Sequence, residues 1–141
     1  PFVRPDDIDQ AVEKLRRDAE ADSAQTVTTL PHNFHAYNQR VVQEGTARFM
    51  FPEERKACYN KQTKPSLYRF GNLLVTRTRA ILERRELFGV RSLALEIPSA
   101  YAVDVDAPPD VEWAEWLLAT GKVVLPHLEE RPVARSAPSV R

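Results

Sequence analysis

Apolar positions recur at helical spacing along residues 1–89, and each such run begins beside a proline. Residues 5–22, 31–45, 52–63 and 65–88 share this pattern. Proline suits the first turn of a helix because no carbonyl there needs the amide donor that proline lacks. The pattern therefore predicts four helices. The longest is expected to end before Gly89, since glycine favours the position just past a helix end.

The pattern changes beyond Gly89. Residues 91–97 and 101–105 alternate loosely between apolar and polar side chains, which predicts either a hairpin or two extended arms. Residues 108–121 predict a short last helix with a proline start and a glycine stop. Residues 23–29 are polar and rich in threonine, and they predict a connector.

These elements together predict a mainly α protein. Residues 1–89 are expected to form a small, irregular helical domain of four to five helices started by prolines. Residues 90–128 are expected to form an extended arm that carries a short Trp-containing helix. Residues 129–141, rich in proline and arginine, are expected to be a flexible tail.

Charge is balanced over the whole chain but uneven along it. Twenty Lys and Arg residues match twenty Asp and Glu residues. Residues 40–91 contain twelve basic and five acidic residues, a net charge of +7, and the flanks carry the opposite charge. A basic middle can face an anionic surface such as lipid headgroups, RNA or an acidic subunit. It can equally be a solvated helix face whose charges pair with the flanks.

The sequence gives little sign of catalysis. Cys58 is the single cysteine, so no internal disulfide and no cysteine-based zinc cluster can form. Glycine is scarce, and no phosphate-binding loop motif occurs. His32 and His35 are spaced for one helix face, yet no further ligand lies nearby, which favours a capping or surface role. His127 suggests nothing further. We expect a protein with no active site, metal or cofactor of its own.

Trp113 and Trp116 are three residues apart on the last predicted helix. They can form a core stripe, or they can be an aromatic anchor that docks in a partner's groove. A helix of this length between proline-rich segments is marginal alone, which favours docking slightly. No stretch approaches the roughly 20 apolar residues of a membrane span.

The segment from residue 30 to about residue 86 resembles subunit 7 of the mitochondrial cytochrome bc1 complex, the ubiquinone-binding-protein family. The resemblance rests on an ordered series of short motifs that ends in the charged run Glu83–Glu86. The positions that match the family are Leu30, Pro31, Asn33, Arg40, Pro52, Glu54, Tyr59, Leu67 and Tyr68. The family lacks a counterpart of residues 18–29 and of about fifty residues at the end of this chain.

This resemblance implies a helical, non-catalytic accessory subunit of complex III. Such a subunit lies peripherally on the matrix side of the mitochondrial inner membrane and supports assembly. Its partners are cytochrome b and the core subunits, with anionic phospholipid headgroups as a further possibility. The basic ridge would face acidic loops or those headgroups. It consists of Arg69, Arg77, Arg79 and Arg84.

Other classes stay open on the sequence. Leu67-Tyr68-Arg69 followed by Phe70 resembles the tripeptide of the LYR family of respiratory-complex accessory subunits, which implies a three-helix bundle. A peripheral mitochondrial ribosomal or other RNA-binding protein would use the basic middle on phosphate, although the neutral net charge disfavours nucleic acid. A viral or phage assembly protein shares the same design of helices and arms.

Overall fold

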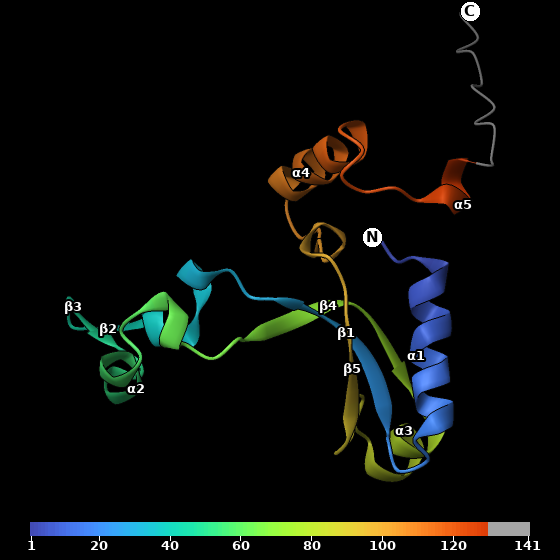
Figure 1. The fold of residues 1–141 in the computed structure, drawn as a ribbon, viewed down its shortest axis with the longest axis horizontal. Helices are drawn as coiled ribbons and strands as arrows, with labels where there is room; N and C mark the ends of the chain where they lie inside the picture. The colour runs from blue at the N-terminus through green and yellow to red at the C-terminus, as the bar shows by residue number, and fades with distance from the viewer. Residues whose placement is uncertain (130–141) are drawn as a thin grey trace, which may run out of the picture.

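The computed structural model describes residues 1–129 and combines helices with two sheets, one of three strands and one of two (Figure 1). The fold is therefore α/β, and the expectation of a mainly helical protein is wrong. In chain order the elements are α1 (Pro5–Arg17), β1 (Ser23–Thr29), the 3₁₀ turns η1 (His32–Phe34) and η2 (Ala36–Asn38), β2 (Arg40–Gln43), β3 (Thr46–Phe49), α2 (Pro52–Ala57), η3 (Lys61–Thr63), β4 (Tyr68–Thr76), α3 (Thr78–Arg84), β5 (Ser92–Glu96), η4 (Ser99–Tyr101), α4 (Pro108–Ala119) and α5 (Pro126–Glu129).

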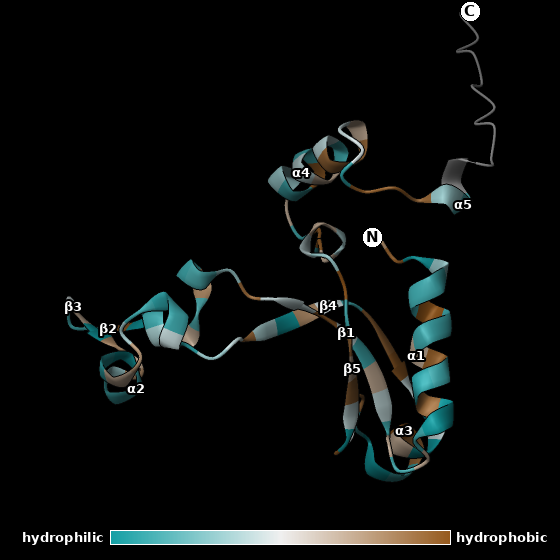
Figure 2. Ribbon diagram, viewed as in Figure 1, coloured by the Kyte–Doolittle hydropathy of each residue, from teal (hydrophilic) through white to brown (hydrophobic). Residues whose placement is uncertain are grey.

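The larger sheet has the strand order β4-β1-β5. Strand β1 runs antiparallel to β4 and parallel to β5, so Ala24 lies between Val75 and Leu93. Helix α1 packs on this face through Ala11 and Leu15, which are fully buried or nearly so. Small alanines at the contact let the helix approach the strands closely, and the stripe of apolar residues along α1 is visible in Figure 2.

Helix α1 starts at Pro5, as the sequence predicts, but it ends at Arg17 instead of near residue 22. The carboxylate of Asp18 accepts hydrogen bonds from the backbone amides of Glu20 and Ala21 at 3.1 and 3.2 Å. An aspartate side chain that captures nearby amides offers the backbone an alternative to the helix. This turn redirects the chain into β1.

Residues 23–29 form the central strand of the sheet, so the predicted connector is wrong. Thr26 and Thr28 are buried although they are polar. The Thr26 hydroxyl oxygen accepts hydrogen bonds from the backbone amides of Asn72 and Leu73, both at 2.9 Å. Threonine is also β-branched and favours strands. The polarity of this segment disguised a buried strand whose hydroxyls are satisfied by β4.

The long helix predicted over residues 65–88 is also wrong. Its first part is strand β4, which pairs with β1 from Ser23↔Thr76 to Thr29↔Tyr68. Its last part is the short helix α3, which ends in a left-handed residue, Arg85 with φ 58°. Pairing between residues that are 39 to 53 positions apart in sequence overrides local helical spacing, because a strand ladder satisfies the backbone hydrogen bonds equally well.

Residues 31–66 form a projection that we call the distal arm, which extends away from the sheet between β1 and β4 (Figure 1). The helix predicted over 31–45 is wrong, since two 3₁₀ turns and strand β2 stand there. Glu44 and Gly45 both have positive φ, as a tight hairpin turn between β2 and β3 requires. Helix α2 starts at Pro52 as predicted, but it ends at Ala57.

Strand β5 confirms the extended segment predicted after Gly89, but its partner is β1, so the hairpin around residue 98 is wrong. Helix α4 begins at Pro108 as predicted. It packs Leu117 against Phe2 and Val123 in a second small core. The flexible tail predicted for residues 129–141 lies outside the described residues, apart from Glu129.

Candidate interaction surfaces

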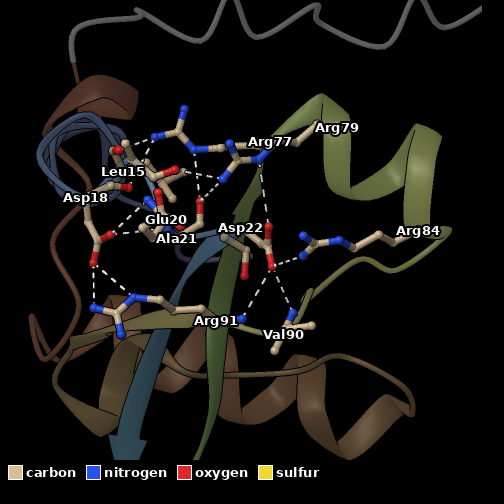
Figure 3. A network of polar contacts seen from close by, with 12 residues as sticks. Leu15, Asp18, Glu20, Ala21, Asp22, Arg77, Arg79, Arg84, Val90 and Arg91 are labelled. Atoms are coloured by element: carbon tan, nitrogen blue, oxygen red, sulfur yellow. Dashed lines mark hydrogen bonds and ion pairs between the residues drawn. The ribbon is translucent and has the colours of Figure 1, made fainter.

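A polar network joins three segments that are remote in sequence, and Asp22 lies at its centre (Figure 3). The Asp22 side chain is 2% exposed. Its Oδ2 accepts hydrogen bonds from Arg84 Nη1 at 2.7 Å and from the Val90 amide at 2.9 Å. The Val90 amide bond is the main reason that the pKa of Asp22 lies below its ordinary value, helped by the amide of Arg91 and the charge of Arg84.

Two further arginines cap the end of α1 and the turn after it. The guanidinium of Arg77 donates to the carbonyl oxygens of Leu15 and Ala21. Arg79 Nη2 donates to the carbonyl of Ala19 at 2.7 Å. Cations at a helix C-terminus satisfy carbonyls that lack intrahelical donors and complement the helix dipole. These side chains hold α1 against the sheet.

The predicted basic ridge is thus largely engaged within the chain. Arg69 belongs to the same pattern, since its Nη2 donates to the Ala102 carbonyl at 2.7 Å. Arg79 and Arg84 keep 45% and 49% of their side chains exposed. That the ridge faces a partner or phospholipid stays a prediction. Its internal bonds reduce the donors that remain for phosphate, whether of RNA or of lipid.

The distal arm has almost no core of its own. His35 is the one buried residue between residues 31 and 66. Large apolar side chains there face solvent, among them Phe34 at 59% exposed, Val42 at 69% and Tyr59 at 72%. A segment that buries so little apolar surface gains little free energy to offset the entropy of ordering it. Burial of these apolar side chains against another surface would supply that free energy.

One face of the arm hairpin is hollowed and apolar. A groove of about 560 Å³ runs along it, lined by Val41, Gln43, Ala47, Arg48, Phe49, Met50 and Pro52. Arg40 and Arg55 stack on the Phe49 ring, with guanidinium carbons 4.5 and 5.0 Å from the ring centre. The groove therefore combines an apolar floor with cations at its edge.

Helix α4 carries a second apolar patch. Trp113 and Trp116 stack on each other, with ring centres 4.8 Å apart, and remain 51% and 43% exposed. The Nζ atom of Lys122 lies 5.6 Å from the centre of the Trp116 ring. Leu117, not the tryptophan pair, supplies the buried face of this helix. The two tryptophans therefore do not form the core stripe, and their role as a docking anchor stays a prediction.

The histidines and the cysteine do not come together as a reactive site. His35 caps η2, because its Nδ1 accepts from the Tyr37 amide at 3.1 Å while Nε2 lies 3.0 Å from the Pro65 carbonyl oxygen. This confirms the capping role expected for it. Cys58 is half-buried and free. Among the side chains described, no group of three metal-ligating residues converges.

The positions that carry the family resemblance are spread over the arm and its base. Leu30 and Pro31 follow β1, and Asn33 lies in η1. Arg40 opens β2, whereas Pro52 and Glu54 lie in α2. The remaining positions are Tyr59 after α2, Leu67 just before β4, and Tyr68 and Arg69 at the start of β4, where the Leu-Tyr-Arg tripeptide opens a strand.

Comparison with protein-family models finds no match, and comparison with curated proteins finds none either. Within residues 1–129, no helix combines the length and the apolar character that crossing a membrane requires.

The hairpin of the distal arm lies within a run of apolar residues at helical spacing, which predicted a helix instead. One signal was present: Glu44-Gly45 is flanked by valines on one side and by Thr46 and Phe49 on the other, which is a hairpin pattern.

Proposed function

We propose that this protein acts as a non-catalytic docking module, and that its distal arm binds the surface of a protein partner. The observation that carries the proposal is the burial pattern of the arm: within residues 31–66 only His35 is buried, while Phe34, Val42 and Tyr59 are exposed. Exposed apolar patches of this kind are typical of interaction sites in soluble proteins.

The charges of the arm indicate the chemistry of the partner. Residues 31–66 contain six basic and three acidic residues, a net charge of +3. None of them forms an ion pair with another described residue. A complementary surface would therefore be apolar at its centre and acidic at its rim. Such a surface would cover the exposed apolar side chains of the arm, Val42 among them, and satisfy the arginines stacked on Phe49.

Membership of complex III stays a separate, finer prediction. The resemblance implied a helical subunit, and the residues that carry it form strands, short turns and one short helix. The docking proposal does not depend on it. If the prediction is right, the arm is the part that would contact the core subunits or cytochrome b.

Val42→Asp tests the docking proposal. Val42 is exposed and pairs with Ala47 in the arm hairpin, so the substitution disturbs no core. A tagged full chain should co-migrate with a larger assembly in native extracts, and the variant should migrate alone. A buried charge at an apolar contact costs several kcal/mol, roughly enough to abolish a complex of micromolar affinity.

Thr46→Asp is the matched control. Thr46 is an exposed polar residue of the same hairpin, and it would receive the same charge. It should leave assembly intact. If the wild-type chain migrates as a monomer at every concentration, or if both variants behave alike, the docking proposal is wrong.

A further inference from the structure

A cavity of about 270 Å³ opens at the base of the distal arm, where β1 ends and β4 begins. The Leu30 amide donates to the Leu67 carbonyl at 2.8 Å and closes the strand ladder beside it. His32, Lys61 and Lys64 are among the residues that line it. They come from η1, η3 and the segment just after η3, so the fold brings together groups that the sequence separates.

Cations are gathered here without an acidic counterpart. Asn38 Oδ1 accepts a hydrogen bond from Arg55 Nη1 at 2.6 Å and another from Lys64 Nζ at 2.9 Å. Lys61 has no hydrogen-bond partner among the described residues. Among the side chains that the structure describes, no carboxylate pairs with any of these three cations. Like charges held around one neutral oxygen repel each other, and an anion would relieve that repulsion.

The two histidines of the cavity are held in different ways. His35 forms part of the cavity wall, and its ring is fixed in place because both ring nitrogens contact backbone groups. The pKa of His32 lies below its ordinary value, chiefly because of burial and then because of the charges of Lys64 and Lys61. Burial and the charge of Arg55 likewise lower the pKa of Lys64. A bound anion would oppose the electrostatic part of both effects.

We propose that this cavity binds the phosphate group of a small molecule, with Lys61 and Lys64 as charged donors and His32 as a neutral donor at the rim. Two ammonium groups and a nearby guanidinium match the charge of a phosphate dianion better than that of a single carboxylate. The volume leaves room for a compact phosphorylated metabolite. This inference does not rest on the docking proposal, because His32, Lys61 and Lys64 lie outside the apolar groove of the hairpin and phosphate binding needs no protein partner. Arg55 lies near both sites.

NMR titration of the full chain with inorganic phosphate tests the inference, with sodium chloride added to match ionic strength. The ring signals of His32, assigned with His32→Gln, should move with phosphate, and the pKa of His32 should rise. Lys61→Gln should weaken phosphate binding at least about tenfold, because a hydrogen bond to a charged group is lost. Since the Lys61 ammonium forms no hydrogen bond or ion pair with a described residue, this variant should fold normally.

Lys56→Gln is the matched control, because Lys56 is an exposed lysine of the same arm that lies outside the cavity. It should bind phosphate as the wild type does. Equal weakening by Lys56→Gln and Lys61→Gln would show diffuse charge attraction and overturn the inference. It would also be overturned by a His32 shift that chloride alone reproduces, or by acetate binding as tightly as phosphate.

Discussion

Arg84 Nη1 lies 2.7 Å from Asp22 Oδ2, although 62 residues separate the two in sequence. The bond links α3 to the residue that precedes β1. The same oxygen accepts from the Val90 amide just before β5. Asp22 therefore joins the segment before β1 to the helix after β4 and to the residues before β5. This explains why the Arg84 side chain is directed toward Asp22.

The Asp22 network makes stability sensitive to acid. Because its pKa is lowered in the folded protein, the carboxylate contributes stability that is complete above the ordinary value of 3.8 and is lost as pH falls through the folded pKa. Asp22→Asn should lower the melting temperature at pH 7 and flatten its fall between about pH 5 and pH 2. Asp9→Asn, an exposed site on α1, should leave both unchanged. A wild-type acid profile in Asp22→Asn would contradict the network's role.

Gly89 is required for two separate reasons. Its φ is +69°, and a Cβ there would lie 2.3 Å from the Cβ of Asp22. Gly121 has a similar φ of +67° but open space around it. Gly121→Ala should therefore cost only the backbone term, about 1–2 kcal/mol, whereas Gly89→Ala should cost clearly more. Urea denaturation measures both, and equal losses would show that the contact with Asp22 relaxes freely.

Leu117 anchors α4 to the second core. It is 2% exposed, whereas its neighbour Leu118 is 44% exposed. Leu117→Ala should cost roughly 2–5 kcal/mol of unfolding free energy, and Leu118→Ala less than about 0.5 kcal/mol. Chemical denaturation of the two variants is the measurement. If Leu117→Ala is as mild as Leu118→Ala, α4 does not pack on Phe2 and Val123.

The Thr26 hydroxyl supports the irregular pairing between β1 and β4, where the register shifts between Gln25 and Val27. Thr26→Val keeps the shape but leaves the amides of Asn72 and Leu73 without their acceptor. We expect a loss of roughly 1–3 kcal/mol in urea denaturation. Thr26→Ser keeps the hydroxyl and should recover most of it. A Thr26→Val variant as stable as wild type would mean that water replaces the hydroxyl.

Local signals in the sequence predicted local features correctly. Pro5, Pro52 and Pro108 each start a helix, because proline and the acidic residues that follow it fit a first turn regardless of the rest of the chain. Strand β5 was also visible from its alternation. The ends of α1 and α2 were not, because side-chain bonds and packing decide them.

The sheet could not be predicted in the same way, since its partners are remote. Thr26 becomes a core residue only when the backbone amides of Asn72 and Leu73 donate to its hydroxyl. A single helix over residues 65–88 would place Arg77 and Arg84 on a ridge that faces solvent. Once β4 ends at Thr76, those arginines meet the end of α1 and Asp22. The contacts of these arginines therefore depend on the sheet, and helical spacing alone could not indicate them.

Photo-crosslinking from the distal arm tests the docking account most directly. A photoreactive phenylalanine analogue would replace Val42, and as control Gln10 on the exposed side of α1. Position 42 should give a discrete crosslink to an apolar, acidic surface, which mass spectrometry can map, and position 10 should give none. The account is contradicted if position 42 yields no specific product and hydrogen exchange shows the arm of the lone chain as protected as β1.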